Sequence, residues 1–262
     1  MTDPMEERFG ELSDGTEVSI YTLTGSGGLR ARVMNLGATL VSLEAADRRG
    51  AMGDVILGYD SPQEYLEGGC YFGGTIGRVA GPILHGRADI AGQIYSLPCN
   101  EGAHHLHGGF RGFNKVMWRA AEAVAGDGPG VTFSYLSRDG EEGYPGNLAV
   151  NVTYSVTERN ALRIEYLALT DRTTLANLTN HSYFNLAGQG EGDILGHELT
   201  LHAHQFNPDD ADIVPTGVVA PVAGTPFDFR TPTRIGARID ADDEQIRCGR
   251  GYDHNWLIAD AD

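Results

Sequence analysis

Apolar residues alternate with polar or small residues in two neighbouring stretches near the middle of the chain. The first stretch covers residues 148–156 and the second covers residues 162–168, with a polar break at residues 158–160 between them. A period of two places every second side chain on one face of a strand. The pattern therefore predicts two strands joined as a β-hairpin.

Shorter alternations of the same kind occur at residues 131–135 and 199–203. They predict further strands, the second of which ends at a polar turn. The best candidate for a brief helical turn begins at Ser61, because a serine cap is followed by Pro62 at the first helical position and Glu64 at the third. The pattern predicts no long amphipathic helix.

Glycine and proline interrupt these strands throughout the chain, with 36 and 11 copies respectively. Many short strands separated by such turns favour an all-β fold, a large antiparallel β-sandwich, over a fold of alternating strands and helices. A chain of 262 residues can bury a sizeable core. We expect one domain that spans residues 1–262.

The composition narrows the classes of partner. With 36 acidic against 19 basic residues, the formal net charge is -17. Such a surface repels nucleic acid and anionic membranes, so neither is expected as a partner, and a neutral small molecule is favoured.

Three cysteines without a Cys-x-x-Cys pair indicate neither a disulfide framework nor a zinc knuckle. Residues 1–10 carry Asp3, Glu6 and Glu7, whereas a secretion signal begins with basic residues and continues with an apolar run. A cytoplasmic location is therefore expected.

The segment from Thr179 to Leu186 reads Thr-Asn-His-Ser-Tyr-Phe-Asn-Leu and contains the strongest candidate chemistry. Its amides and hydroxyls match a polyol, and its aromatic rings offer flat faces for a sugar. His181 can give or take a proton near neutral pH. The simpler interpretation of His181 alone is a hydrogen-bonded core histidine, and its neighbours favour a functional one.

Several other histidines raise the alternative of a metal site: His104, His105, His107, His202 and His204. Neither His-x-His pair is followed by the carboxylate that a metal site of this type needs. The alternation around residues 202–204 is also explained by a solvated strand face. We therefore expect no metal.

The acidic segment at residues 209–212 lacks the spacing of a calcium-binding loop. It is interpreted as a solvent-facing turn.

Two common enzyme classes lose support. Residues 25–28 are rich in glycine but lack the Lys-Ser/Thr of a nucleotide-binding loop, and the chain has no Gly-x-Ser-x-Gly elbow. Nucleotide-dependent enzymes and serine hydrolases are therefore not favoured.

Near the end, residues 251–256 read Gly-Tyr-Asp-His-Asn-Trp. Asp253 there is either part of a capped turn or an acceptor for sugar hydroxyls.

Taken in order, a series of motifs resembles the aldose 1-epimerase, or galactose mutarotase, family. The matching segments are residues 35–38, 54–59, 77–80, 106–109, 180–186, 215–217, 224–229 and 251–255. Leu-His-Gly-Gly is a weak motif by itself, and Asn-His-Ser-Tyr-Phe-Asn-Leu is a strong one. The resemblance implies a galactose mutarotase-like supersandwich, a sugar cleft and no cofactor. It also implies interconversion of the α and β anomers of a hexose such as galactose or glucose.

The resemblance implies roles for particular residues. His181 would be the acid that protonates the ring oxygen, and His107 would hydrogen-bond the sugar and steady the developing charge. Asp253 would hold hydroxyls, with Tyr183 and Arg78 as further sugar contacts.

The chain departs from the family pattern at two places. Pro82 stands where the family has an arginine that reaches the sugar. The family's catalytic base is a glutamate on a strand beyond residues 251–255, whereas this sequence stops at Asp262, so that strand is expected to be missing. A general base supplies a rate factor of about 10² to 10⁴. Three alternatives stay open: a shortened active enzyme, a sugar-binding paralogue without activity, or an enzyme with another base. Unpaired sheet edges would favour a homodimer.

Overall fold

The computed structural model describes residues 4–125 and 128–259. The chain divides into two compact units, Met1–Glu191 and Gly192–Asp262, which we name the first and the second unit and describe separately. The expectation of a single domain stays a prediction. Within the described ranges, no helix is both long enough and apolar enough to span a bilayer.

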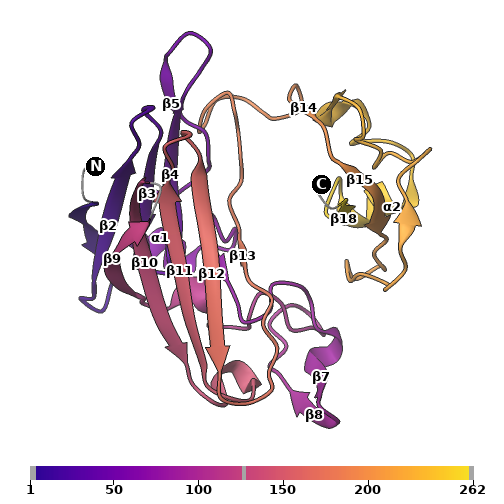
Figure 1. Ribbon diagram of the computed structural model, residues 1–262. Coiled ribbons are helices and arrows are strands. Elements are labelled where there is room, and N and C mark those ends of the chain that lie inside the picture. Colours follow the sequence, from indigo (N-terminus) through magenta and orange to yellow (C-terminus); the bar gives the residue numbers. More distant parts are fainter. Residues whose placement is uncertain (1–3, 126–127, 260–262) are drawn as a thin grey trace. The chain divides into compact units, whose positions relative to one another are not determined.

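The first unit begins with a five-stranded antiparallel sheet whose strands follow the chain order (Figure 1). Its strands are β1 (Met5–Glu11), β2 (Glu17–Thr24), β3 (Arg30–Met34), β4 (Thr39–Ala46) and β5 (Met52–Asp54). The buried residues of β2 alternate with more exposed ones, as expected for a strand with one face on the core.

A second, four-stranded antiparallel sheet has the order β12-β11-β10-β9. Its strands are β9 (Arg119–Ala125), β10 (Gly128–Ser137), β11 (Leu148–Val156) and β12 (Leu162–Thr170). Residue 148 pairs with residue 170, and residue 156 pairs with residue 162. The predicted hairpin is therefore confirmed.

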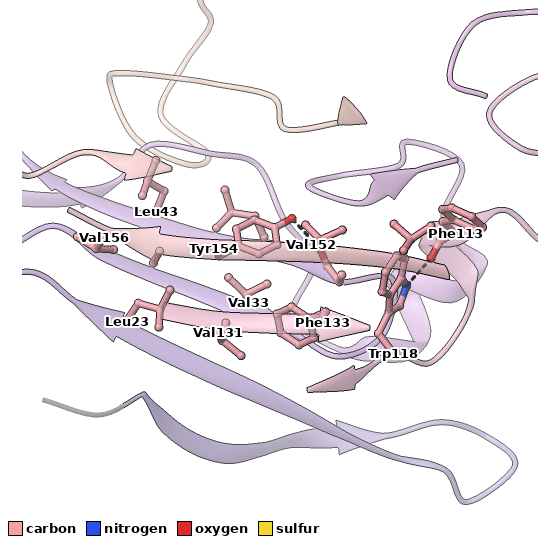
Figure 2. Close-up of a cluster of buried hydrophobic side chains, with 14 of the residues drawn as sticks. Leu23, Val33, Leu43, Phe113, Trp118, Val131, Phe133, Val152, Tyr154 and Val156 are labelled. Carbon is pink, nitrogen blue, oxygen red and sulfur yellow. Dashed lines mark hydrogen bonds between the residues drawn. The ribbon is translucent and has the colours of Figure 1, made fainter. Parts of the chain in front are cut away.

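The two sheets share one hydrophobic core, so the predicted antiparallel β-sandwich is confirmed (Figures 1 and 2). Leu23 and Val33 come from the first sheet, and Phe133 and Val152 come from the second. All four are at most 1% exposed. The indole Nε1 of the buried Trp118 donates to the carbonyl oxygen of Phe113 at 3.0 Å (Figure 2).

Short elements complete the first unit. These are the strands β6 (Thr75–Ile76), β7 (Arg87–Ile90), β8 (Gln93–Ser96) and β13 (Thr179–Asn180), the helix α1 (Pro62–Glu67), and the 3₁₀ turns Leu84–Gly86, Phe113–Lys115 and Glu141–Gly143. The predicted cap of α1 is confirmed. The backbone N–H of Glu64 donates to Ser61 Oγ at 3.4 Å, and that of Ser61 donates to the Glu64 carboxylate at 3.0 Å.

The second unit is built from short pieces. It contains β14 (Glu198–Leu199), β15 (Ala203–Asn207), β16 (Ala220–Pro221), β17 (Thr233–Arg234), β18 (Asn255–Ile258), the helix α2 (Glu244–Gly249) and the 3₁₀ turn Ile235–Ala237. Its core contains Phe206, Phe227 and Ile246. Trp256 Nε1 donates to the carbonyl oxygen of Phe227 at 3.0 Å.

The predicted strand over residues 199–203 is wrong as a continuous element. β14 ends at Leu199 and β15 begins at Ala203. Between them the backbone N–H of Leu201 donates to the carbonyl oxygen of Phe229 at 2.7 Å. This bond pairs Leu201 with a segment outside the ladders of β14 and β15. A local alternation of apolar residues does not reveal a bond to such a distant segment.

One buried hydroxyl connects the core of the first unit to the segment that carries His181. Tyr154 is fully buried, and its OH donates to the carbonyl oxygen of Ala38 at 2.8 Å. The same OH accepts from Asn180 Nδ2 at 3.2 Å. Burial raises the pKa of Tyr154 to about 12.

Replacing Tyr154 with Phe is expected to lower the free energy of unfolding by about 1 to 3 kcal/mol, because both hydrogen-bond partners stay behind in a buried site. Urea denaturation measures the loss. Tyr95→Phe is the matched control, since its OH donates to the exposed side chain of Gln93, at 2.9 Å. Equal losses in the two variants would contradict the prediction.

Candidate active site

His181 directly follows β13, which pairs antiparallel with β6. Two backbone hydrogen bonds extend this short ladder. The N–H of His181 donates to the carbonyl oxygen of Gly74, and the N–H of Gly73 donates to the carbonyl oxygen of His181, both at 3.0 Å. Both backbone groups of His181 therefore bond to residues 73–74, which we name the clamp.

Gly73 is required at this position for two reasons. Its φ of 60° is a left-handed conformation that L side chains rarely adopt, and an added Cβ would lie 1.8 Å from the carbonyl oxygen of Leu40. That carbonyl belongs to β4. The clamp thus joins the His181 segment to the first sheet of the sandwich.

The amides on either side of His181 have structural partners, which corrects the expectation that they are available to a polyol. Asn180 Nδ2 donates to the carbonyl oxygen of Gly73 at 2.8 Å, and Asn180 Oδ1 accepts from the N–H and the OH of Ser182 at 3.2 and 2.6 Å. Asn185 is 4% exposed and bonds to the backbone of Ala187 and Glu191. Both amides order the loop.

His107 lies in a turn with left-handed backbone at three consecutive positions, His107, Gly108 and Gly109. A Cβ on Gly108 would lie 1.7 Å from the carbonyl oxygen of Gly77. The Leu-His-Gly-Gly motif is therefore explained by a turn that packs directly on a neighbouring backbone. The Glu142 carboxylate accepts from the next two backbone N–H groups, those of residues 110 and 111, both at 3.1 Å.

The orientation of the His107 ring determines its tautomer. Its Nδ1 lies 2.5 Å from the carbonyl oxygen of Ala80. A carbonyl oxygen only accepts, so Nδ1 carries the hydrogen. In the neutral imidazole, Nε2 is then the acceptor.

The two predicted catalytic histidines converge. The ring centroids of His107 and His181 are 5.1 Å apart, at an interplanar angle of 76°. Both side chains are half-buried. Two imidazoles at this separation can reach neighbouring atoms of one sugar ring. The simpler interpretation of His181, a histidine enclosed in the core, does not fit its partial exposure.

Tyr71 contacts both imidazoles, and the sequence analysis missed it. Its ring centroid lies 4.7 Å from that of His107 and 5.6 Å from that of His181. Tyr71 stands between strands, outside any periodic pattern. The only local signal is its position two residues before Gly73, the residue of the clamp that only glycine fits.

Tyr183 lies next to His181, with ring centroids 5.1 Å apart. It is 41% exposed and also contacts Phe72, at 5.2 Å. Its backbone carbonyl accepts from the N–H of Leu57 at 2.9 Å, which connects the segment to the residues that follow β5. An exposed ring at the edge of a histidine pair suits a sugar contact, and that role stays a prediction.

Arg78 is 2% exposed, and its guanidinium bonds entirely within the protein. Its Nε donates to Ser137 Oγ at 2.8 Å, and its terminal nitrogens donate to the backbone carbonyls of residues 137, 138, 145 and 146 at 2.9 to 3.0 Å. Burial lowers the pKa of Arg78. These contacts favour a structural role, in place of the predicted sugar contact.

The remaining histidines of the upstream cluster have structural surroundings. His105 is fully buried, with Nδ1 2.8 Å from the carbonyl oxygen of Pro98 and Nε2 2.7 Å from the OH of Tyr144. Burial lowers the pKa of His105. In the second unit, His202 and His204 are exposed on either side of the buried Ala203, as predicted for a solvated face. Across residues 4–125 and 128–259, no three or more His, Cys, Asp or Glu side chains are grouped to hold a metal.

Asp253 belongs to the second unit, where it precedes β18. The side chains of Tyr252, His254 and Trp256 are less exposed than those of Asp253 and Asn255, so the segment alternates between a core face and an open face. Trp256 and Tyr252 pack against the Phe227 cluster. Asp253 is on the open face, where a carboxylate is available to hydroxyl groups.

The core face of this segment includes a pair of buried polar side chains. His254 Nε2 lies 3.8 Å from the Asp209 carboxylate and 3.0 Å from Gln245 Oε1. Asp209 is 5% exposed, so its interpretation as part of a solvent-facing turn is wrong. The chain reverses there so that Asp209 packs on α2, where its N–H donates to Gln245 Oε1 at 2.7 Å.

Burial favours the neutral forms of this pair. It raises the pKa of Asp209 from 3.8 to about 6, with a further contribution from the negative charges of Asp253 and Asp210. It lowers the pKa of His254, against the opposing effect of nearby carboxylates.

Gly73→Ala is expected to be strongly destabilising, by about 2 to 5 kcal/mol, because it adds a backbone clash to left-handed strain. Gly50→Ala is the matched control. Gly50 has a φ of 85°, but an added Cβ meets no atom within 4 Å, so only strain of about 1 to 2 kcal/mol remains. Urea denaturation measures both, and equal losses would show that the clamp tolerates a methyl group.

Asp209→Asn is expected to unfold at a higher temperature than the parent above pH 6. A carboxyl whose pKa is raised on folding stabilises the protein most below its unfolded pKa, and loses that contribution as pH rises from about 4 through about 6. The gap between variant and parent should therefore close toward pH 4. Thermal unfolding by circular dichroism from pH 4 to 8 measures it, with the exposed Asp240→Asn as control. A gap independent of pH would contradict the prediction.

Comparisons with known proteins identify the family. Residues 19–262 match the family model described as aldose 1-epimerase. The chain is 44% identical over 254 residues to the galactose mutarotase of Rattus norvegicus, covering 97% of this chain and 71% of that protein. It is 36% identical over 245 residues to the aldose 1-epimerase of Escherichia coli strain K12, covering 94% and 69%. The crystal structure of galactose 1-epimerase from Lactobacillus acidophilus NCFM matches with a TM-score of 0.87 and 32% identity, over 98% of this chain and 74% of that chain. The chain belongs to the aldose 1-epimerase family.

Proposed function

We propose that this protein interconverts the α and β anomers of a hexose such as galactose or glucose. The observation that carries the proposal is the pair His107 and His181, with ring centroids 5.1 Å apart in a family named for this reaction. The galactose mutarotase and aldose 1-epimerase names of the relatives support the substrate class and the isomerase activity.

The reaction opens and recloses the sugar ring. A base removes the proton of the C1 hydroxyl while an acid protonates the ring oxygen, so that the bond between C1 and the ring oxygen breaks and C1 becomes an aldehyde. Rotation about the bond between C1 and C2 then presents the other face of the aldehyde. The same two proton transfers, run in reverse, close the ring.

His181 acts as the acid at the ring oxygen. An imidazole exchanges its proton near neutral pH, and the clamp at residues 73–74 fixes the backbone from which this ring projects. His107 binds the sugar beside it. The hydrogen bond between Nδ1 and the carbonyl oxygen of Ala80 fixes the orientation in which this ring lies beside His181.

Sugar binding draws on aromatic and carboxylate side chains. Tyr183 offers an exposed ring beside His181, which supports a stacking contact with the pyranose. Asp253 presents a carboxylate on the open face of its segment, which supports an acceptor role for sugar hydroxyls.

The second candidate function is sugar binding without catalysis. One sequence feature favours it: Pro82 replaces the family's arginine, and proline has no side-chain donor for a sugar.

Polarimetry or NMR exchange with freshly dissolved α-glucose and α-galactose tests the first candidate. The chain is expected to accelerate mutarotation, and His181→Ala is expected to remove about 10² to 10⁴ of that acceleration because the acid is lost. His204→Ala, an exposed histidine of β15, is the control and should keep full activity. Full activity in His181→Ala would contradict the assignment.

Calorimetric titration with the same sugars separates the two candidates. Heat of binding without acceleration supports the sugar-binding paralogue, and acceleration supports the epimerase. Neither heat nor acceleration with a folded chain would overturn both.

The expected homodimer and cytoplasmic location stay predictions. In the sheet order of the described residues, β12 is an edge strand, and its Leu167 and Leu169 are 55% and 65% exposed. An exposed apolar edge supports pairing between two copies.

A further inference from the structure

We infer that Tyr71 is a positioning residue for the catalytic histidine pair: its ring holds both imidazoles in the orientation that the reaction needs. The inference rests on the proposed function for its kinetic consequence. Its structural part, the orientation of the two rings, is open to measurement without any sugar.

Tyr71 contacts the two imidazoles in different ways. It meets His107 edge to face, with an interplanar angle of 85° and centroids 4.7 Å apart. It is tilted by only 35° against His181, with centroids 5.6 Å apart. The two histidine rings are themselves at 76°. One tyrosine ring thus contacts two imidazoles that are nearly perpendicular to each other, and removing it opens space beside both.

Tyr71 is itself held by the clamp. Its φ of 56° starts a turn in which its carbonyl accepts from the N–H of Gly74 at 3.0 Å. Gly73, inside this turn, donates to the carbonyl oxygen of His181. The residue that orients the imidazoles and the backbone that carries His181 are therefore parts of one hydrogen-bonded unit.

The two tyrosines beside His181 differ in surroundings. Tyr183 is 41% exposed, whereas Tyr71 is half-buried. The half-buried ring of Tyr71 is restricted in its rotamers before substrate binds, which suits a residue that holds its neighbours in place. The exposed ring of Tyr183 suits contact with the sugar.

The chemistry of the Tyr71 hydroxyl argues for a role of the ring. Burial raises the pKa of Tyr71, and the nearby Glu101 carboxylate raises it further. A phenolate is therefore disfavoured at neutral pH, and Tyr71 is poorly suited to act as a base. The packing role needs only the ring and does not depend on the protonation state of the hydroxyl.

The test compares Tyr71→Phe, Tyr71→Leu and Tyr71→Ala in the full chain. Without sugar, the NOE cross-peaks between the ring protons of His107 and His181, assigned with His107→Gln and His181→Gln, should weaken in the Leu and Ala variants and keep the parent intensity in Phe. In mutarotation assays, Tyr71→Ala should lower kcat by about tenfold to a hundredfold, because a displaced catalytic group loses alignment, with a smaller change in KM. Tyr71→Phe should keep kcat and its pH profile.

Tyr95→Ala, a half-buried tyrosine of β8, controls for general loss of packing and should leave both readouts unchanged. Unchanged NOE intensities between the two histidines and an unchanged kcat in Tyr71→Leu and Tyr71→Ala would overturn the inference. A kcat loss in Tyr71→Phe equal to that in Tyr71→Ala would also overturn it, because the hydroxyl would then act chemically. If the parent chain shows no mutarotation, the proposed function fails, and the NOE intensities still decide the positioning role. Tyr71→Leu preserves bulk, so the NMR comparison stands if Tyr71→Ala does not fold.

Discussion

The candidate active site depends on the pair of backbone hydrogen bonds between residues 73–74 and His181. The N–H of Gly73 and the carbonyl oxygen of Gly74 bond to the two backbone groups of His181, and the contact of Gly73 with the carbonyl of Leu40 excludes any side chain at this position. Leu40 belongs to β4 and to the hydrophobic core of the sandwich. The position of the proposed acid therefore depends on the packing of the first sheet as well as on its own loop.

Polar side chains around the site connect it to the core in a chain of hydrogen bonds. Asn180 joins Gly73 to Tyr154, and the Tyr154 hydroxyl continues to the carbonyl oxygen of Ala38. Next to the His107 turn, the Arg78 guanidinium likewise donates to backbone carbonyls within residues 137–146 and connects these segments. Every one of these bonds is within the protein, so these polar side chains stabilise the loops that carry the two histidines.

Features that depend on local chemistry could be predicted from the sequence. The hairpin of β11 and β12 follows from a period of two, and the cap of α1 follows from Ser61, Pro62 and Glu64, because the interacting groups are close along the chain. The convergence of His107 and His181 could be anticipated only through the family resemblance, since 73 residues separate them. The matches to the family model and to relatives confirm that resemblance.

Partners chosen across long sequence distances could not be predicted. An amide such as Asn180 has the same composition whether it faces a sugar or a tyrosine 26 positions away. Arg78 and Asp209 are charged residues that a local pattern places at the surface, yet each is buried by segments far along the chain. Tyr71 lacks any periodic context, so its position beside both imidazoles depends on the turn at Gly73.

The placement of the two tryptophans has a practical consequence. Trp118 lies in the core of the first unit with its indole bonded to Phe113, and Trp256 lies in the second unit with its indole bonded to Phe227. The chain has two tryptophans in all, so each unit carries one intrinsic fluorophore. Replacing either indole leaves an emission signal that reports on one unit, and the coincidence or separation of the two melting curves then measures the thermodynamic coupling between the units.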